Sequence, residues 1–400
     1  MAALAALLAS ASLVLPSQAN AGSSASGREA NGTTAVPSPM RGPKDHSVVK
    51  ALPPVKMIKC GDALNRLRAS KGTAKHVACL DEHPLARTFG IGPDPNWDAH
   101  PDFCQFNKAV LYSRQDACQW GTWPFRVLDR QGTLVGSGVI EYLVWETVNT
   151  KSLDMYQVLK VRPLALTGVA EVNTFTPTTT CSGAQCAITG TDPVTPTIPV
   201  VTGRAYKGTW NAKVSVAKDK SFLTHWTNHL QITGPGWIQP ASADLPDAPA
   251  IRCDKIITKS TGGCVLPGWP PTLSLSLSDT DPENGVSEAA QHIKDSQNRG
   301  PHWGREKDGK PLTRLIDTKL QKANRDAACP ASRPPGPAGT SCDEYPFAST
   351  HQGAALEGKN DFTVRDINEH HNSNAGTDLG LVYNTYRMLD GDQFWVRIDP

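Results

Sequence analysis

Ten cysteines that fall into five pairs of near neighbours limit the fold of this 400-residue chain more than any other feature. The pairs are Cys60 and Cys79, Cys104 and Cys118, Cys181 and Cys186, Cys253 and Cys264, and Cys329 and Cys342. None forms a Cys-x-x-Cys motif, so the spacing of a zinc ribbon is absent. An even number of cysteines suits an oxidising compartment. Neighbour pairing is the working hypothesis, because sequence alone does not fix connectivity.

The first 21 residues favour export of the chain. They are an apolar run of Ala, Leu and Val that ends in Ala19-Asn20-Ala21, where a signal peptidase would find small residues. The basic residues that usually precede such a run are missing, and a buried helix is the alternative. A membrane anchor is disfavoured because the run is short and contains Pro16. The sequence therefore predicts a signal peptide over 1–21 and a secreted, extracellular protein with no membrane anchor in its mature form.

The length predicts a multidomain protein of about two folded units. Residues 22–55 are rich in Ser, Gly, Ala, Pro and Thr, which predicts a disordered linker. Residues 56–277 contain short β-branched and aromatic runs separated by turn residues, which predicts a β-rich domain resembling an antiparallel sandwich. Within it, the Thr- and Pro-rich stretch 174–202 is expected to be edge strand or loop. The role of this domain is left open, because its tryptophans suit a buried core better than a ligand platform.

Residues 278–300 mix Ser, Asp, Asn and Gly around one short helical run at 288–295, and we expect a linker there. Residues 301–400 then predict a small α+β domain. Apolar spacing indicates helices over 312–328 and 377–389 and strands over 362–367 and 393–398. The order strand, strand, helix after Cys342 is compatible with a ββα-metal nuclease core.

The charge balance argues against a storage or architectural DNA binder. The formal net charge of the chain is +2, and residues 301–400 hold 12 Lys or Arg against 14 Asp or Glu, a difference of −2. A protein that grips duplex DNA through many phosphate contacts needs a larger basic surface, whereas an enzyme that releases its product does not.

Three motifs in the last hundred residues resemble the NucA/NucB deoxyribonuclease family. They are Cys342-Asp343-Glu344-Tyr345-Pro346-Phe347-Ala348-Ser349, Asn372-Ser373-Asn374-Ala375-Gly376 and Asp390-Gly391-Asp392-Gln393-Phe394. The resemblance covers residues 300–399. It implies a ββα-metal core, nonspecific endonucleolytic cleavage of DNA and dependence on Mg²⁺ or Mn²⁺.

The resemblance also implies roles for single residues. Asp343 would be the general base, in place of the histidine of other ββα-metal enzymes, and Glu344 would orient water or contact phosphate. Asn372 would place the metal or the scissile phosphate, with Asn384 as a second oxygen ligand of the kind that hard cations prefer. Neighbouring strand residues point to opposite faces, so the two carboxylates share one ion only if the chain turns between them.

Further candidates complete the predicted site. His371 is a candidate acid, and Arg314, Arg325, His351 and Asn374 are candidates for substrate binding; solvent-exposed loop positions are the alternative for the histidines. Ser373 stands where the family usually has Arg, which removes one expected phosphate contact. A catalytically weak or inactive surface protein that binds carbohydrate or DNA therefore stays open as an alternative, and an immunity or inhibitor protein is a further partner to consider.

Overall fold

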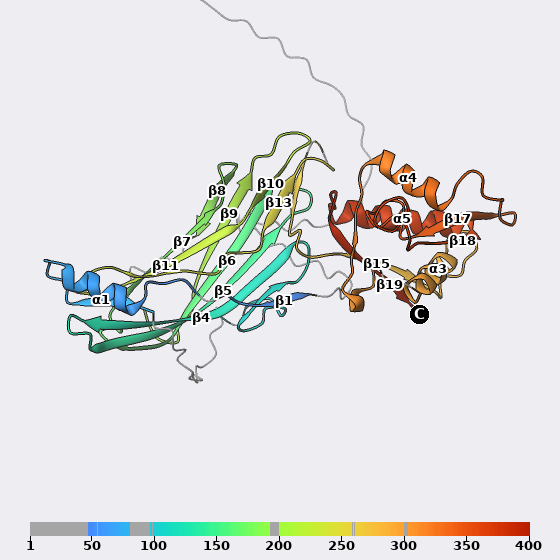
Figure 1. The fold of residues 1–400 in the computed structure, drawn as a ribbon. Coiled ribbons are helices and arrows are strands. Elements are labelled where there is room, and N and C mark those ends of the chain that lie inside the picture. Colours follow the sequence, from blue (N-terminus) through green and yellow to red (C-terminus); the bar gives the residue numbers. More distant parts are fainter. Residues whose placement is uncertain are drawn as a thin grey trace, which may run out of the picture. The chain divides into compact units, whose positions relative to one another are not determined.

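A computed structural model describes residues 47–53, 55–80, 97, 99–192, 200–257, 259, 261–299 and 303–400 (Figure 1). All of them belong to the unit Gly42–Pro400. The predicted signal peptide over 1–21 and most of the predicted linker over 22–55 lie outside the described residues.

The first part of this unit is built on a large antiparallel sheet with the strand order β1-β3-β4-β5-β6-β9-β8, and β2 pairs with β4 beside it. The strands are β1 (Val48–Ala51), β2 (His76–Cys79), β3 (Lys108–Leu111), β4 (Asp116–Asp129), β5 (Leu134–Val148), β6 (Asp154–Gly168), β8 (Cys186–Asp192) and β9 (Tyr206–Val214). Helix α1 (Cys60–Ala69) packs against β2 and β4. Alternation of buried and exposed positions along β4 and β9 reflects one face turned to the core.

Two smaller antiparallel sheets complete this β-rich part. One has the order β12-β11-β7, from Ala241–Asp244, Trp226–Thr233 and Thr174–Cys181, and the other has β10-β13-β14, from Ser221–Thr224, Ile251–Asp254 and Gly263–Val265. One hydrophobic core joins the sheets through side chains such as Trp123, Leu159, Trp226 and Leu230. The prediction of a β-rich, antiparallel architecture is therefore confirmed.

Two sequence expectations within this part are refined. Strand β1 pairs with β3, so residues 48–51 are not part of a disordered linker; their backbone groups complete the edge of the sheet. The Thr- and Pro-rich stretch contains β7 and β8, and each stands at the end of its strand order. An edge is where a proline is tolerated, because its nitrogen cannot donate to a neighbouring strand.

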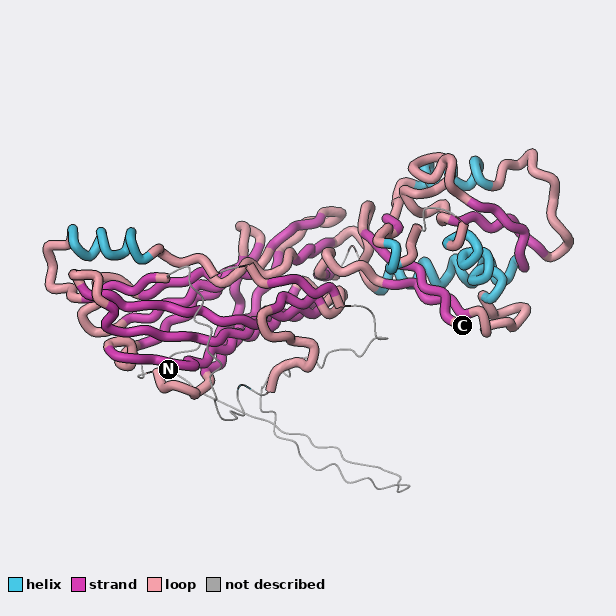
Figure 2. Tube along the Cα trace, turned by 60° about the horizontal axis from the view of Figure 1, so that its bottom comes forward, coloured by secondary structure: helices cyan, strands magenta, loops and turns pink. Residues whose placement is uncertain are grey.

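The C-terminal part, residues 272–400, combines two small sheets with three α-helices (Figure 2). Strand β19 (Gln393–Asp399) lies between β15 (Thr272–Ser276), which is parallel to it, and β16 (Leu312–Thr313), which is antiparallel. Strands β17 (Thr340–Tyr345) and β18 (Thr363–Asn368) form a separate hairpin. The remaining elements are α3 (Ser287–Gln297), the short 3-10 helix η1 (Glu306–Asp308), α4 (Thr318–Ala328) and α5 (Glu369–Thr385).

The expected linker over 278–300 is wrong, because 11 of its 23 residues form the helix α3. Ala289, Ala290 and Ile293 of α3 are buried in the same core as Leu312, Phe394 and other residues of the C-terminal part. Polar residues dominate the segment, but its three apolar side chains lie on one helical face. Strand β15, expected within the β-rich domain, pairs instead with β19.

Capping side chains move two predicted helix starts. Asp317 accepts hydrogen bonds from the N–H groups of Lys319 and Leu320, so α4 begins at Thr318 rather than at residue 312. Asn368 caps α5 in the same way, and this helix begins at Glu369 rather than at residue 377. It ends at Thr385, before the predicted end at residue 389.

All five disulfides join the neighbouring cysteines that the working hypothesis paired. Over the residues that the structure describes, no helix is both long and apolar enough to cross a membrane.

Buried ion pairs connect the β-rich part with the C-terminal part. Arg252 of β13 donates to both carboxylate oxygens of Asp392, at 2.6 and 2.8 Å, and Arg114 donates to the same carboxylate. A second pair has its cation on the C-terminal part, where Arg387 donates to Asp254 of β13 at 2.5 Å. All five side chains are at least about nine-tenths buried, so each charge depends on its partners.

Candidate active site

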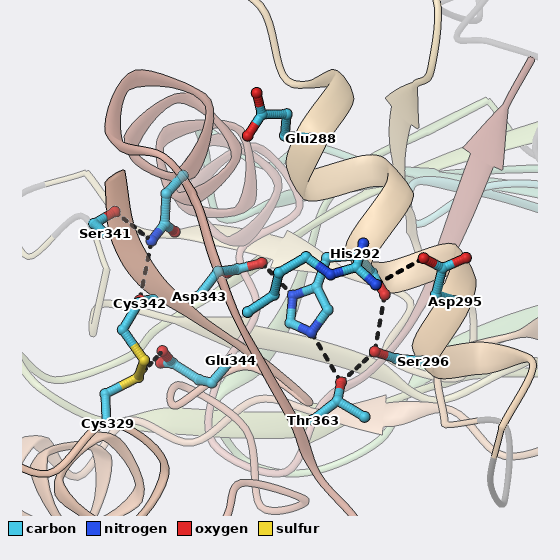
Figure 3. Close-up of polar contacts among 12 residues, drawn as sticks. Glu288, His292, Asp295, Ser296, Cys329, Ser341, Cys342, Asp343, Glu344 and Thr363 are labelled. Carbon is cyan, nitrogen blue, oxygen red and sulfur yellow. Dashed lines mark hydrogen bonds and ion pairs between the residues drawn. A yellow bond between two sulfur atoms is a disulfide. The ribbon is translucent and has the colours of Figure 1, made fainter. Parts of the chain in front are cut away.

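A buried histidine holds the carboxylate of the predicted general base. Asp343 lies on β17, and its Oδ2 is 2.6 Å from Nδ1 of His292, which projects from α3 (Figure 3). The ring continues through Nε2, 3.0 Å from the hydroxyl of Thr363 on β18. That hydroxyl contacts the hydroxyl of Ser296, one turn after His292 on α3. A polar chain therefore runs from the strand carboxylate into the interior.

The hydroxyl groups of this chain have a defined order of donors and acceptors. Ser296 donates to the carbonyl oxygen of His292 at 2.9 Å, which uses its only hydroxyl proton. Thr363 must then donate to Ser296, and it can only accept from Nε2 of the ring. Nδ1 of the same ring faces the Asp343 carboxyl, so the side chain of His292 bridges Asp343 and Thr363.

Glu344 occupies a different environment beside Asp343. Burial raises the pKa of its carboxyl to about 7, and the negative charge of Asp343 acts in the same direction while Arg325 opposes it. The distance from Arg325 Nη2 to Glu344 Oε1 is 3.8 Å, and the Arg325 side chain is 68% exposed. A carboxyl with this pKa exchanges its proton near neutral pH.

Asn372 links the first turn of α5 to the strand that carries Asp343. Its Nδ2 donates to Ser341 Oγ at 3.0 Å and to the carbonyl oxygen of Cys342 at 3.2 Å. With its amide nitrogen fixed on β17, the side-chain oxygen Oδ1 is the group left to meet a ligand.

These residues line one pocket of about 360 Å³, called here the β17 pocket. Among the predicted site residues, it brings together Asp343, Glu344, Asn372, Arg314 and Arg325. Although neighbouring residues of a strand alternate in direction, both carboxylates contribute to its lining. Arg314 lies over the ring of Tyr383, with its guanidinium carbon 4.5 Å from the ring centroid, and donates to the carbonyl oxygen of Met388. The pocket thus combines acidic, amide and cationic groups.

The structure does not bring four other predicted residues to this pocket. His371 is buried against the loop before α3, with Nε2 2.8 Å from the carbonyl oxygen of Asp281 and Nδ1 accepting from the N–H of Glu288. Asn374 donates to the carbonyl oxygens of Glu283 and Gly285 in the same loop. Both side chains therefore hold α5 against the start of α3 rather than facing the pocket.

His351 and Asn384 are also placed elsewhere. His351 Nε2 is 3.3 Å from Asp390 Oδ1, outside the β17 pocket. Asn384 is exposed near the end of α5. It follows Asn372 by 12 residues, which at the rise of an α-helix is about 18 Å along the axis. The two asparagines therefore cannot bind one cation together.

Sequence reasoning missed His292, Ser296 and Thr363. The first two lie in the segment taken for a linker, and His292 is 51 residues from Asp343 in the chain. The signal that could have identified the first two was the short helical run over 288–295. In this run His292 follows the apolar residue Ala289 by about one turn.

The disulfide between Cys329 and Cys342 fastens the β17 strand. It joins the residue after the end of α4 to the residue before Asp343 (Figure 3). On the loop-entropy model, such a bond raises the free energy of unfolding of the protein by about 3 kcal/mol. The position of Asp343 is therefore fixed from one side by a covalent bond and from the other by His292.

The pocket suits a cation with few protein ligands. Across the described ranges, no group of three or more His, Cys, Asp or Glu side chains is arranged to hold a metal ion. The β17 pocket does hold oxygen donors, because Asp343 and Glu344 bring carboxylates and Asn372 brings an amide oxygen. Mg²⁺ keeps several of its waters in proteins and needs only one or two carboxylates, so this donor set fits such an ion.

Comparison with known proteins identifies the C-terminal residues. The family model described as deoxyribonuclease NucA/NucB matches residues 304–397, which include β17, β18 and α5. Neither curated proteins nor solved structures gave a match. The matched segment contains Asp343, Glu344, Asn372, Arg314 and Arg325 but not His292. Residues 304–397 are therefore a domain of the NucA/NucB deoxyribonuclease family.

Proposed function

We propose that the protein is a secreted, metal-dependent endodeoxyribonuclease that hydrolyses DNA phosphodiester bonds without sequence preference. The observation that supports this most is the β17 pocket. Within the residues matched by the deoxyribonuclease family, Asp343, which a buried histidine contacts, lines one pocket with Asn372 and two arginines. The hairpin of β17 and β18 followed by α5 would be the ββα-metal core.

In this proposal Asp343 is the general base. One of its oxygens, Oδ2, is engaged by His292, and the other can accept the proton of the attacking water. His292 is a positioning residue, because it touches Asp343 and has its second nitrogen fixed by Thr363. Arg314 and Arg325 would bind the phosphate and offset charge that builds up on its oxygens.

Asn372 would hold one Mg²⁺ or Mn²⁺ ion together with water, beside the two carboxylates of the pocket. When bound, this ion would neutralise charge on the pentacoordinate phosphate and stabilise the leaving 3′-oxygen. Glu344, whose pKa burial raises to about 7, would pass a proton to or from a bound water near neutral pH.

Export follows from the same proposal. Five disulfides suit a chain that folds in an oxidising compartment, and the apolar first 21 residues would direct it there. DNA outside the cell would then be the substrate.

Plasmid digestion by the full chain tests the proposal. Supercoiled DNA should be converted to nicked and then short products with Mg²⁺ or Mn²⁺ and should stay intact with EDTA. D343N should lower the cleavage rate by at least about 100-fold, because the amide cannot accept the proton. H370Q, at an exposed histidine outside the pocket, serves as the matched control. Retardation of DNA without shortening by the wild type, or full activity of D343N, would overturn the assignment.

A further inference from the structure

The charged residues that line a second pocket of the C-terminal part are mainly cations. Its volume is about 350 Å³, and its charged lining residues are Lys294, Arg305, Lys307 and Arg397 against a single acid, Glu306. None of these residues lines the β17 pocket. Residues 301–400 are net negative, so this pocket, called here the basic pocket, concentrates positive charge that the domain as a whole lacks.

The four cations differ in how far they are already neutralised. Arg305 pairs with Asp308, and Arg397 donates to Asp399 at 2.9 Å. Lys294 and Lys307 are exposed and form no ion pair with any residue in the described ranges. Two lysine ammonium groups are therefore available to an anionic ligand.

An aromatic ring lies among these cations. Trp395 of β19 is half-buried and lines the basic pocket together with Lys294 of α3 and Lys307 of η1. Stacking of a base on an aromatic ring, combined with lysines that bind the backbone, is how proteins bind single-stranded nucleic acids without reading sequence. A duplex does not fit into such a cavity with its bases paired, whereas one unpaired nucleotide does.

The basic pocket is connected to the proposed catalytic strand. Gln297 at its base donates to the hydroxyl of Tyr345, the residue that follows Glu344, at 3.1 Å and to the carbonyl oxygen of Val396 at 3.2 Å. Helix α3 lines both pockets, through Ile293 in the β17 pocket and Lys294 in the basic pocket.

We propose that the basic pocket is a secondary binding site for single-stranded DNA, with a base stacked on Trp395 and the flanking phosphates on Lys294 and Lys307. The proposal rests on DNA being the substrate of the β17 pocket. It gives the enzyme a second contact with the DNA strand that is cut.

Binding without cleavage tests this site separately from catalysis. Fluorescence anisotropy of a labelled 12-nucleotide single strand is measured in EDTA with full-length protein carrying D343N, alone and combined with K294Q/K307Q. The double lysine change should raise Kd by about tenfold or more. The plot of log K against log salt should become shallower by about 1.4, since each lost phosphate contact on a single strand contributes about 0.7.

Two further variants identify the aromatic contribution. W395A should weaken binding as well, whereas W395F should retain most of it because the ring still stacks. K359Q, at an exposed lysine outside both pockets, is the control and should bind as its parent does. Circular dichroism of each variant confirms that it is folded.

The outcomes separate the two proposals. Unchanged single-strand binding and salt slope in K294Q/K307Q overturn the basic-pocket site, whether or not the wild type cleaves DNA. Weakened binding of a blunt duplex with intact binding of the single strand overturns it as well. Lysine-dependent single-strand binding by a wild type that cleaves nothing would support the site while the nuclease assignment fails.

Discussion

His292 shows that a single residue outside the matched domain can belong to its site. The family match begins at residue 304, yet the side chain in contact with Asp343 comes from α3. A fragment cut at the boundary of the match would lose this contact and leave the carboxylate without its buried donor. The structural unit that surrounds Asp343 is therefore larger than the family match.

Substitution of His292 should affect the chemical step more than binding. H292L is expected to lower kcat for plasmid cleavage by about 10- to 100-fold, the usual effect of losing a residue that orients a reactive group. H292N keeps an N–H donor toward Asp343 and should recover part of the loss. Steady-state kinetics over pH 5 to 9 is the measurement. Equal activity of H292L and wild type, or no advantage of H292N over H292L, contradicts the positioning role.

The burial of Glu146 predicts that the stability of the folded protein depends on pH. It is 2% exposed in the main core, neither carboxyl oxygen has a partner among the described residues, and burial raises its pKa from 4.5 to about 8. The native state thus holds a proton that the unfolded chain releases above about pH 4.5. The contribution of this carboxyl to the stability of the folded state is fully present below that pH. It is lost as the pH rises through about 8.

The substitution E146Q should remove this loss of stability at high pH. At pH 8.5 its melting temperature should exceed that of the wild type by at least about 2 °C, while at pH 4 the two should be similar. Differential scanning calorimetry at several pH values measures the difference, and E171Q, at an exposed glutamate, is the control. Parallel curves for E146Q and wild type would show that burial of this carboxyl has no such effect.

At the scale of elements, the cap of α5 stabilises the helix that carries Asn372. Asn368 accepts from the N–H groups of His370 and His371 at 2.8 and 3.4 Å. N368A should cost about 1 kcal/mol of unfolding free energy in urea titrations, and N368S, which keeps a capping oxygen, should cost less. S373A, at an exposed position of the same helix, should change stability by less than about 0.5 kcal/mol. Equal destabilisation of the N368S and N368A variants would argue against a capping role for Asn368.

The sequence predicts those elements whose signal is local. Alternating β-branched residues marked the strands, and the proposed base, its neighbouring acid and Asn372 were found because the motifs that contain them are continuous. Helix starts were misplaced because Asp317 and Asn368, and not the apolar periodicity, determine them. Helix α3 and His292 were missed because their partners lie far along the chain, and only packing brings Asp343 to them.

For the whole molecule, the ion pairs around Asp392 connect the β-rich part to the site. Asp392 also accepts from the N–H of Leu389, and its carbonyl oxygen accepts from the N–H of Arg314, a residue of the β17 pocket. Arg252 and Arg114 therefore fix the turn that places this pocket cation. The β-rich part thus contributes to the order of the proposed site without lining it.

R252M tests this coupling. Removing one partner from a buried carboxylate should lower the unfolding free energy by about 3 kcal/mol, and KM for DNA should rise because Arg314 loses a fixed backbone. K213Q breaks an exposed pair with Asp154, in which both side chains are more than half exposed, and should cost less than about 0.5 kcal/mol. Thermal unfolding and steady-state cleavage are measured together. Unchanged stability and KM in R252M would show that the network does not couple the two parts.

The bond between Cys329 and Cys342 has a consequence for the cell that makes this protein. Thiols stay reduced in most cytoplasms, so a newly made chain would lack the disulfide at Cys342, one residue before Asp343. Under the proposed export, this strand would become anchored only after the chain had left the compartment that contains the genome. Under the proposed function, oxidation would then complete the nuclease site only at a distance from the producer's own chromosome.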